Sequence, residues 1–333
     1  MEKEFIILNE KRNVTLTAYI QEVGGKFDYI SKRPAILILP GGGYQYCSER
    51  ESDPVAFPYL QAGYQVFILH YSVAEHNTWP NPLDDVEQAM TLIRSREDWH
   101  VYPDKVAVIG FSAGGHLAAA AATMSVNRPN AAILGYAVAG EDVKGCNPTA
   151  PDITKYVDGN TCPCFVFATR TDDVVPIQNS IDFIGALDKA NVSFESHIYA
   201  YGPHGFSVCN SSVNYRNTAI CERTPNWVSD SIGWLKDVLG DFGDGEITKP
   251  VCKAHFTGDN DANLSADCSV GYLLDKEKAR EAMGDVAEQL ESDKDMLVLI
   301  RKMTLRGILR FVKTPNDLID EIDRKLRTIT NYE

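Results

Sequence analysis

Apolar runs of strand length alternate with amphipathic stretches of helix length through about the first 240 residues. Continuous apolar runs are typical of strands buried on both faces of a sheet. The predicted strands cover residues 5–8, 14–20, 34–39, 65–71, 106–109, 131–138, 164–169 and 194–199. Because strand, helix and strand repeat, we predict an α/β fold with a mostly parallel, doubly wound sheet and an antiparallel edge made by the first two strands.

The stretches between these runs carry apolar residues at every third or fourth position, as a helix with one buried face does. A helix is predicted over residues 177–190 on this basis, and two others are predicted over 54–62 and 227–239. The predicted buried face of the first of these comprises Ile177, Ile181, Ile184 and Leu187.

The pattern changes near residue 240, where buried runs stop and helical spacing continues alone. Residues 241–250, rich in glycine and acidic side chains, are predicted to be a linker. In the last predicted helix, Thr314 is the expected N-cap and Pro315 the first-turn residue. The sequence therefore predicts an α/β domain over residues 1–243 and a small α-helical C-terminal domain over residues 244–333.

Composition narrows the classes of partner. The chain has 333 residues, of which 44% are hydrophobic, and a formal net charge of −14. This charge disfavours nucleic acid and anionic membrane surfaces as partners. The first residues lack the pattern of a signal peptide and no apolar run reaches transmembrane length, so we expect a cytoplasmic protein. The oligomeric state, a homo-oligomer included, stays open.

The eight cysteines are scattered through a chain with a large core, so we expect free thiols and no disulfide framework. Cys162 and Cys164 flank a single proline, but no histidine cluster lies near them in the sequence. We therefore expect structural roles for both and predict neither a metal nor a cofactor.

The most informative stretch joins the predicted strand 106–109 to an alanine-rich helix through Gly110-Phe-Ser112-Ala-Gly114. A serine on such a turn projects its oxygen above the sheet, and small flanking residues let the two backbone arms pass closely. The helix that follows directs free N–H groups and its positive dipole end toward the turn. We interpret Ser112 as a nucleophile; the alternative is a tight turn with an incidental serine.

Three consecutive glycines occupy residues 41–43, directly after the predicted strand 34–39 and Pro40. A backbone without side chains can turn its N–H groups into a cavity. In lipase and esterase folds, a glycine loop of this kind and the residue after the nucleophile supply hydrogen bonds to an oxyanion. We expect Gly42, Gly43 and Ala113 to form this oxyanion hole, with an ordinary glycine-rich loop as the alternative.

A serine nucleophile needs a base, and histidine titrates near neutral pH. His204 lies in the loop after a predicted strand and fits this role. An aspartate would orient the imidazole, and Asp172 and Asp173 both follow the strand 164–169. We favour Asp172 and leave Asp173 open, because either carboxylate could instead cap the helix that follows.

Four segments together carry a family resemblance: Pro-Gly-Gly-Gly-Tyr at residue 40, Gly-Phe-Ser-Ala-Gly-Gly-His at 110, Asp-Asp-Val-Val-Pro at 172 and Gly-Pro-His-Gly-Phe at 202. The chain resembles bacterial α/β-hydrolases of the acetyl xylan esterase-like carbohydrate esterase family over about residues 30–240. The resemblance implies an α/β-hydrolase fold, a triad of serine, aspartate and histidine in that chain order, and deacetylation of sugar esters without a metal. The aspartate motif departs slightly from that of relatives, which keeps Asp173 open.

Three aromatic residues on predicted loops, Tyr44, Tyr46 and Trp79, are candidates to line the pocket mouth, where sugar rings could stack on them. Simple packing is the alternative. The C-terminal region resembles small helical modules at the ends of some carbohydrate-active enzymes, in residues 265–274 and 303–306. That resemblance implies no particular role.

The sequence thus predicts a serine carboxylesterase that hydrolyses acetyl or similarly small acyl esters of carbohydrates, such as xylo-oligosaccharides, through an acyl-enzyme. Its expected partner is a small-molecule or oligosaccharide ester. A serine peptidase of the same fold is one alternative. The other is a non-catalytic carbohydrate-binding or scaffold protein, although such a module has no need for all of Ser112, Asp172 and His204.

Overall fold

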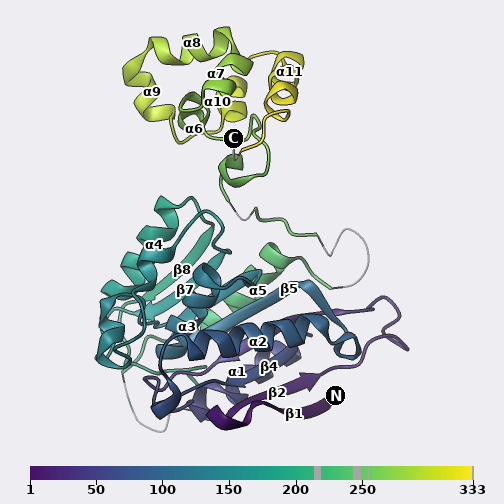
Figure 1. The fold of residues 1–333 in the computed structure, drawn as a ribbon, viewed down its shortest axis with the longest axis vertical. Helices are drawn as coiled ribbons and strands as arrows, with labels where there is room; N and C mark the ends of the chain where they lie inside the picture. The colour runs from purple at the N-terminus through teal and green to yellow at the C-terminus, as the bar shows by residue number, and fades with distance from the viewer. Residues whose placement is uncertain (214–218, 243–248, 254, 332–333) are drawn as a thin grey trace. The chain divides into compact units, whose positions relative to one another are not determined.

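A computed structural model describes residues 1–213, 219–242, 249–253 and 255–331 (Figure 1). The chain divides into two compact units, Met1–Ala254 and His255–Glu333. The domain boundary predicted between residues 243 and 244 lies outside the described residues. No helix among the described residues is both long enough and apolar enough to cross a membrane.

Within the described residues, the first unit is built on one sheet of eight strands in the order β1-β2-β4-β3-β5-β6-β7-β8. The strands are β1 (Glu2–Asn9), β2 (Val14–Ile20), β3 (Arg33–Leu39), β4 (Gln65–His70), β5 (Val101–Phe111), β6 (Ala131–Gly135), β7 (Cys164–Thr169) and β8 (Phe194–Tyr199). Strands β3 to β8 pair in parallel, whereas β2 runs antiparallel to both β1 and β4. The mostly parallel sheet with an antiparallel edge is as predicted.

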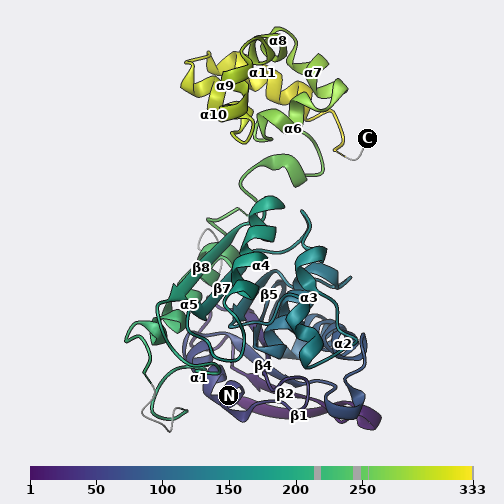
Figure 2. The ribbon, with the colours of Figure 1, turned by 90° about the vertical axis from the view of Figure 1, so that its left-hand side faces the viewer.

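Helices cover both faces of this sheet (Figure 2). One face packs against α1 (Asp53–Gln61) and α5 (Trp227–Leu239). The other packs against α2 (Asn81–Ser95), α3 (Ala113–Met124) and α4 (Gln178–Lys189). The two covered faces explain why every residue of β3 is buried and why residues 34–39 form a continuous apolar run. The predicted doubly wound α/β-hydrolase fold is confirmed.

Short 3-10 helices connect several of these elements: η1 (Glu10–Arg12), η2 (Glu49–Glu51), η3 (Ala74–His76), η4 (Glu97–Trp99), η5 (Glu141–Gly145), η6 (Ile153–Tyr156) and η7 (Thr224–Asn226). All eight cysteines of the chain are free thiols. Cys162 and Cys164 are buried, and the Cys164 thiol donates to the Cys162 carbonyl oxygen.

Two local predictions are wrong. Ile181 is exposed, because α4 buries Phe183 together with Leu187 of the predicted face. The strand predicted to reach residue 138 ends at Gly135, because Tyr136 adopts a left-handed backbone with a φ of 37°. The chain leaves the sheet at that point, and Tyr136 therefore belongs to the loops above the sheet.

The second unit is helical. Its elements are η9 (Gly258–Asn260), α6 (Val270–Leu274), α7 (Glu277–Met283), α8 (Asp285–Ser292), α9 (Lys294–Ile300), α10 (Leu305–Phe311) and α11 (Asn316–Leu326). They enclose their own apolar core, to which Leu273, Leu305 and Ile322 contribute. Helix α11 begins one residue later than predicted, with Pro315 rather than Thr314 at the N-cap position.

Candidate active site

Ser112 lies at the turn between β5 and α3. Its φ of 54° and ψ of −117° are unfavourable for a residue with a side chain. The surrounding chain holds this conformation: the Ser112 N–H donates to the Gly135 carbonyl oxygen at 3.0 Å, and the Ser112 carbonyl oxygen accepts from the His116 N–H at 3.0 Å. A strained turn of this kind, directly after the carboxyl end of a buried strand, is typical of a nucleophilic serine.

The glycines on either side of Ser112 are required by close backbone approach. A Cβ on Gly110 would lie 2.0 Å from the Gly114 carbonyl oxygen, and a Cβ on Gly114 would lie 2.1 Å from that of Leu39. Neither distance is sterically possible. The helix therefore packs directly on the ends of β3 and β5, which places the nucleophile beside the glycine loop.

His204 lies between Ser112 and Asp172. Its Nε2 is 2.8 Å from Ser112 Oγ, and its Nδ1 is 2.8 Å from Asp172 Oδ2. The Asp172 side chain is 1% exposed and the His204 side chain 15%, so the base is open to a substrate while the acid is not. With Nδ1–H donating to the carboxylate, Nε2 is free to accept the serine proton. The structure brings these three predicted residues together.

The geometry distinguishes the two aspartates that the sequence left open. Besides its contact with the imidazole, Asp172 accepts from the N–H groups of Val174 and Val175 through Oδ1, at 2.9 and 2.8 Å. These donors fix the orientation of its carboxylate. Asp173 instead accepts from the backbone N–H of His204, at 3.1 Å. Asp172 is therefore placed to orient the ring, and Asp173 to hold the loop.

The glycine loop follows β3 and touches the nucleophile. A Cβ on Gly41 would lie 3.1 Å from Ser112 Cβ, so this segment passes directly against Ser112. Gly42 and Gly43 have φ values of 129° and 62°. Within the described residues, the N–H groups of Gly42, Gly43 and Ala113 donate to no protein acceptor, whereas that of Gly41 donates to Glu51. The three residues predicted for an oxyanion hole thus have backbone N–H groups that can donate to a ligand.

The three predicted aromatic residues differ in position. Tyr46 is 62% exposed and adjoins Gly42, so it stays a candidate for substrate contact. The prediction for Tyr44 is wrong, because Tyr44 is fully buried. Its hydroxyl lies 2.7 Å from His116 Nδ1. Trp79 is partly buried with its ring edge-on to His116, which matches the packing alternative.

His116 is itself buried under these rings and serves packing. Its Nε2 lies 2.8 Å from the Pro151 carbonyl oxygen, and burial lowers the pKa of His116 to about 4. A neutral ring satisfies both contacts, with Nε2–H donating to the carbonyl and Nδ1 accepting from Tyr44. Within the described part of the chain, no group of three or more His, Cys, Asp and Glu residues has the arrangement of a metal site.

Sequence reasoning missed two residues at this site, Glu51 and Tyr136. The Tyr136 hydroxyl donates to Glu51 Oε1 at 2.6 Å, and the Tyr136 ring lies edge-on to His204 with centroids 5.0 Å apart. In the sequence, Glu51 belongs to a charged triplet that looks solvent-exposed, and Tyr136 lies inside an apolar run. Neither the charged triplet nor the apolar run indicates that these residues lie near Ser112.

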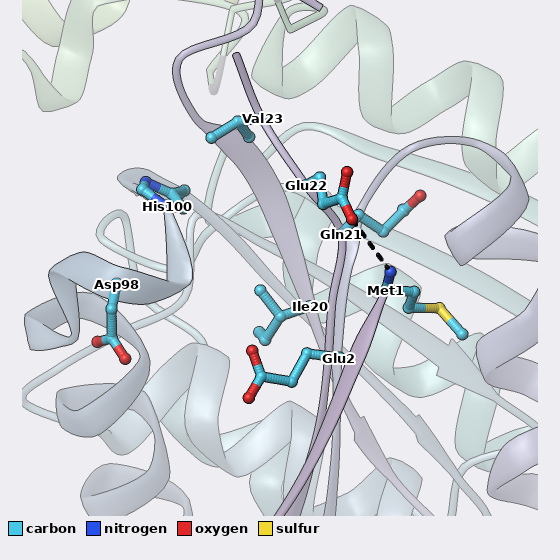
Figure 3. A pocket seen from close by; sticks show the side chains of 8 residues that line it. All are labelled: Met1, Glu2, Ile20, Gln21, Glu22, Val23, Asp98 and His100. Carbon is cyan, nitrogen blue, oxygen red and sulfur yellow. Dashed lines mark ion pairs between the residues drawn. The ribbon is translucent and has the colours of Figure 1, made fainter. Parts of the chain in front are cut away.

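A pocket of about 330 Å³ lies elsewhere on the same unit (Figure 3). Its lining comes from the start of β1, the end of β2 and the turn before β5: Met1, Glu2, Ile20, Gln21, Glu22, Val23, Asp98 and His100. Because β2 runs antiparallel to β4, these positions meet the amino ends of the parallel strands. Ser112 and the glycine loop follow the carboxyl ends of these strands. The pocket and the candidate site therefore lie at opposite ends of the strands.

Comparisons with known proteins indicate the family of this chain. The sequence profile of the BD-FAE family matches residues 28–130, a segment that contains the glycine loop and Ser112. Endo-1,4-beta-xylanase B of Butyrivibrio fibrisolvens is 31% identical over 211 residues, which are 54% of this chain and 33% of that protein. Acetylxylan esterase of Xylanibacter ruminicola is 32% identical over 196 residues, which are 52% of this chain and 41% of that protein. The matched segments thus span less than half the length of these relatives.

A solved structure provides a match over a whole chain. MGS-M1, an α/β-hydrolase enzyme from a Medee basin deep-sea metagenome library, is 43% identical, with a TM-score of 0.68. The match covers 72% of this chain and 98% of MGS-M1. The chain belongs to the α/β-hydrolase family. Within that family, the resemblance to proteins of the acetyl xylan esterase type is confirmed by the relatives named above. This α/β-hydrolase holds the parts that acyl transfer requires: a hydroxyl, a base within hydrogen-bond distance, a carboxylate behind the base, and backbone donors beside the nucleophile.

Proposed function

We propose that this α/β-hydrolase is a serine carboxylesterase that removes acetyl or similarly small acyl groups from carbohydrates such as xylo-oligosaccharides. The observation that carries the proposal is the continuous hydrogen-bonded chain from Asp172 through His204 to Ser112, next to free N–H groups of the glycine loop. A carboxylate, an imidazole and a hydroxyl in this order form the arrangement that activates a serine.

In the first half of the reaction, Ser112 Oγ attacks the ester carbonyl carbon while His204 Nε2 takes the hydroxyl proton. Asp172 stabilises the imidazolium that forms. The carbonyl oxygen becomes an oxyanion, to which the N–H groups of Gly42 or Gly43 and of Ala113 donate. The tetrahedral intermediate then expels the sugar alkoxide, which takes the proton from His204 and leaves as the alcohol.

In the second half, water attacks the acetyl-serine carbonyl and His204 Nε2 takes a proton from that water. A second tetrahedral intermediate uses the same donors, because its oxyanion occupies the same position. Its collapse breaks the bond to Ser112 Oγ, and His204 returns the proton to that oxygen. The product leaves as acetic acid, which gives its remaining proton to water and becomes acetate, and the site is restored to its starting protonation state.

The carbohydrate part of the proposal rests on similarity and on surface character. The matched relative from Xylanibacter ruminicola is named an acetylxylan esterase. Tyr46 presents an exposed aromatic ring beside the glycine loop, where a sugar face could stack. The formal net charge of −14 suits a neutral substrate such as an acetylated xylo-oligosaccharide.

The test is release of acetate from acetylated xylo-oligosaccharides, measured beside hydrolysis of p-nitrophenyl acetate and p-nitrophenyl butyrate. Ser112→Ala is expected to lose all three activities. Ser125→Ala is the matched control, since Ser125 is a buried serine at the other end of the same helix and its hydroxyl accepts a local bond from the Asn127 N–H. We expect it to keep full activity.

Each outcome of this test has a distinct meaning. Acetate release that is lost with Ser112→Ala supports both the nucleophile and the substrate class. Hydrolysis of the nitrophenyl esters without acetate release from the sugar would retain the esterase and remove the carbohydrate assignment. A wild-type protein that hydrolyses none of these esters and does not react with a fluorophosphonate probe would point to a non-catalytic binding protein.

A further inference from the structure

Glu51 is a buried carboxylate beside the candidate site, and the triad chemistry does not use it. It ends η2 and is 4% exposed. A buried carboxylate is costly unless hydrogen bonds replace the water that it loses. Both oxygens of Glu51 have such bonds, and each bond leads to a different part of the site.

The first bond leads to the glycine loop. The Gly41 N–H donates to Glu51 Oε2 at 2.7 Å. A Cβ on Gly41 would lie 2.7 Å from this same carboxylate oxygen, 2.8 Å from the Phe111 carbonyl oxygen and 3.1 Å from Ser112 Cβ. Gly41 is thus held tightly between the carboxylate and the nucleophile. Since Gly42 and Gly43 follow directly, the bond to Glu51 sets where their N–H groups point.

The second bond leads to the histidine loop. The Tyr136 hydroxyl donates to Glu51 Oε1 at 2.6 Å and accepts from the Ser207 N–H at 3.1 Å. The Tyr136 ring meets His204 edge-on and also packs on Phe206, with centroids 4.7 Å apart. Tyr136 therefore contacts the imidazole with its ring and holds the residues after His204 with its hydroxyl.

The charge of Glu51 adds to these contacts. Burial raises the pKa of the Glu51 carboxyl, while the bonds from Tyr136 and Gly41 and the positive charge of a protonated His204 oppose this rise. Two hydrogen-bond donors favour the ionised form, because an ionised carboxylate is purely an acceptor. An anion in this place attracts the imidazolium that His204 becomes during the reaction.

We propose that Glu51 is a positioning residue that ties the oxyanion loop to the histidine loop, so that both sets of groups that stabilise the tetrahedral intermediate depend on one buried carboxylate. This proposal rests on the proposed esterase function. Glu51 acts through the Gly41 N–H and through the Tyr136 ring and hydroxyl, without touching the substrate.

The main variant is Glu51→Gln, which keeps the side-chain shape. Its amide has one acceptor oxygen and no charge, so it cannot accept from both the Gly41 N–H and the Tyr136 hydroxyl as the carboxylate does. We expect kcat for p-nitrophenyl acetate to fall by about tenfold to a hundredfold, with KM within about twofold of wild type, because misplacement of catalytic groups affects mainly the transition state. Tyr136→Phe removes the second bond alone and is expected to lower kcat by less. The double variant should resemble Glu51→Gln within about twofold, since both changes break one network.

Inhibition by a transition-state analogue distinguishes a positioning role of Glu51 from general damage to the fold. Ser112 Oγ adds to the carbonyl carbon of a phenylethyl trifluoromethyl ketone, and the resulting oxyanion lies in the oxyanion hole. The corresponding methyl ketone binds without this addition. We expect the inhibition constant of the trifluoromethyl ketone to rise in Glu51→Gln by the same factor by which kcat/KM falls. The inhibition constant of the methyl ketone should not change.

Asp85→Asn is the matched control. Asp85 is also a fully buried carboxylate, with one oxygen accepting from the Ser72 N–H at 2.8 Å and the other paired with Arg12. This variant should lose stability but keep the kcat of wild type per folded molecule, as judged by circular dichroism and titration of active sites.

The proposal is overturned if Glu51→Gln and Tyr136→Phe both keep the wild-type kcat, or if the trifluoromethyl ketone binds Glu51→Gln as tightly as wild type. It is also overturned if Asp85→Asn loses as much kcat as Glu51→Gln, because the loss would then be a general effect of a buried amide. If Glu51→Gln does not fold, Tyr136→Phe and its ketone inhibition decide the question. An inactive wild-type protein would instead refute the proposed function itself.

Discussion

Two buried carboxylates of the α/β unit, Glu51 and Asp85, have similar burial but different partners. Asp85 pairs with a cation, Arg12, and accepts one backbone N–H, from Ser72. Glu51 accepts from two neutral donors, the Gly41 N–H and the Tyr136 hydroxyl. A buried charge that is neutralised by a neighbouring cation contributes mainly to stability. Glu51 takes its hydrogen bonds from neutral donors, and its charge also attracts Arg50 and a protonated His204.

The comparison also separates two kinds of surroundings. Asp85 joins α2 to the segment after β4 and to η1, and these elements carry no residue of the candidate triad. Glu51 joins two loops that both touch the triad, one at Ser112 and one at His204. The lesson is that a buried carboxylate is informative about function when its partners belong to the loops of a site.

The largest expected effect concerns Asp172, the carboxylate that contacts His204 directly. Its loss of kcat is the reference against which the effects of Glu51 and Asp85 are compared. Asp172→Asn should lower kcat by about 10⁴-fold, because an amide favours the wrong imidazole tautomer. Asp173→Asn should keep kcat within about threefold, as an amide oxygen can still accept from the His204 N–H. Steady-state kinetics with p-nitrophenyl acetate checks this pair. Equal losses in the two variants would contradict the assignment of Asp172.

The second prediction tests the structural carboxylate. Asp85→Asn should lower the free energy of unfolding by roughly 3 kcal/mol, toward the low end of the range for a broken buried ion pair, since Arg12 keeps some access to water. Urea denaturation of wild type and variant measures this difference. A variant as stable as wild type would show that Arg12 and Asp85 do not stabilise the fold.

The third prediction uses the pH dependence of stability to test the raised pKa of Glu51. Burial raises the pKa of folded Glu51 above its ordinary value of about 4.5, so the folded state binds the proton more tightly than the unfolded state does. The contribution of Glu51 to stability is therefore greatest below pH 4.5 and declines as pH rises through the folded pKa. Relative to Glu51→Gln, wild type should lose stability as pH rises from about 4.5 through the folded pKa.

Urea denaturation of wild type and Glu51→Gln at several pH values measures this third effect, and subtracting the two series removes the titration of all other groups. A difference that does not change with pH, or that grows in favour of wild type as pH rises, would contradict a raised pKa. The sign is opposite to that expected for a carboxylate stabilised by a cation, which gains stability as pH rises.

The smallest expected effect belongs to an exposed ion pair. Lys155 contacts Glu141 at 2.6 Å and Asp152 at 3.1 Å, but its side chain is largely in water. Lys155→Met should change the free energy of unfolding far less than Asp85→Asn does, because solvent screens exposed pairs. The same urea experiment measures it, and a loss as large as that of Asp85→Asn would show that burial does not govern these differences.

Much of the fold and part of the site were predictable because they depend on local requirements. The apolar runs that predict strands β3 to β7 follow from burial on both sheet faces, and that burial is confirmed by the helices on each side. Ser112 was identifiable from its flanking glycines, which the turn needs for steric reasons. The glycine run at residues 41–43 was identifiable for the same reason, since a side chain at Gly42 would collide with Tyr46.

Other features depended on contacts between distant segments. Whether Asp172 or Asp173 faces the imidazole is decided by the path of two loops that lie 32 residues apart in the chain. Tyr44 was predicted at a pocket mouth and is instead buried on His116, because its left-handed backbone turns the ring inward. Glu51 and Tyr136 lie 85 residues apart and show no shared pattern in the sequence.

The sequence by itself determined the alternation of strands and helices, the strained serine turn and the glycine loop, because each follows from the chemistry of a few consecutive residues. The tertiary structure alone decided which aspartate contacts the His204 ring, which aromatic rings stay exposed, and that the carboxylate of Glu51 joins the two loops of the site. The physical reason is the range of the interactions. Backbone sterics and hydrophobic periodicity act locally, whereas a buried hydrogen bond exists only after distant segments have packed together.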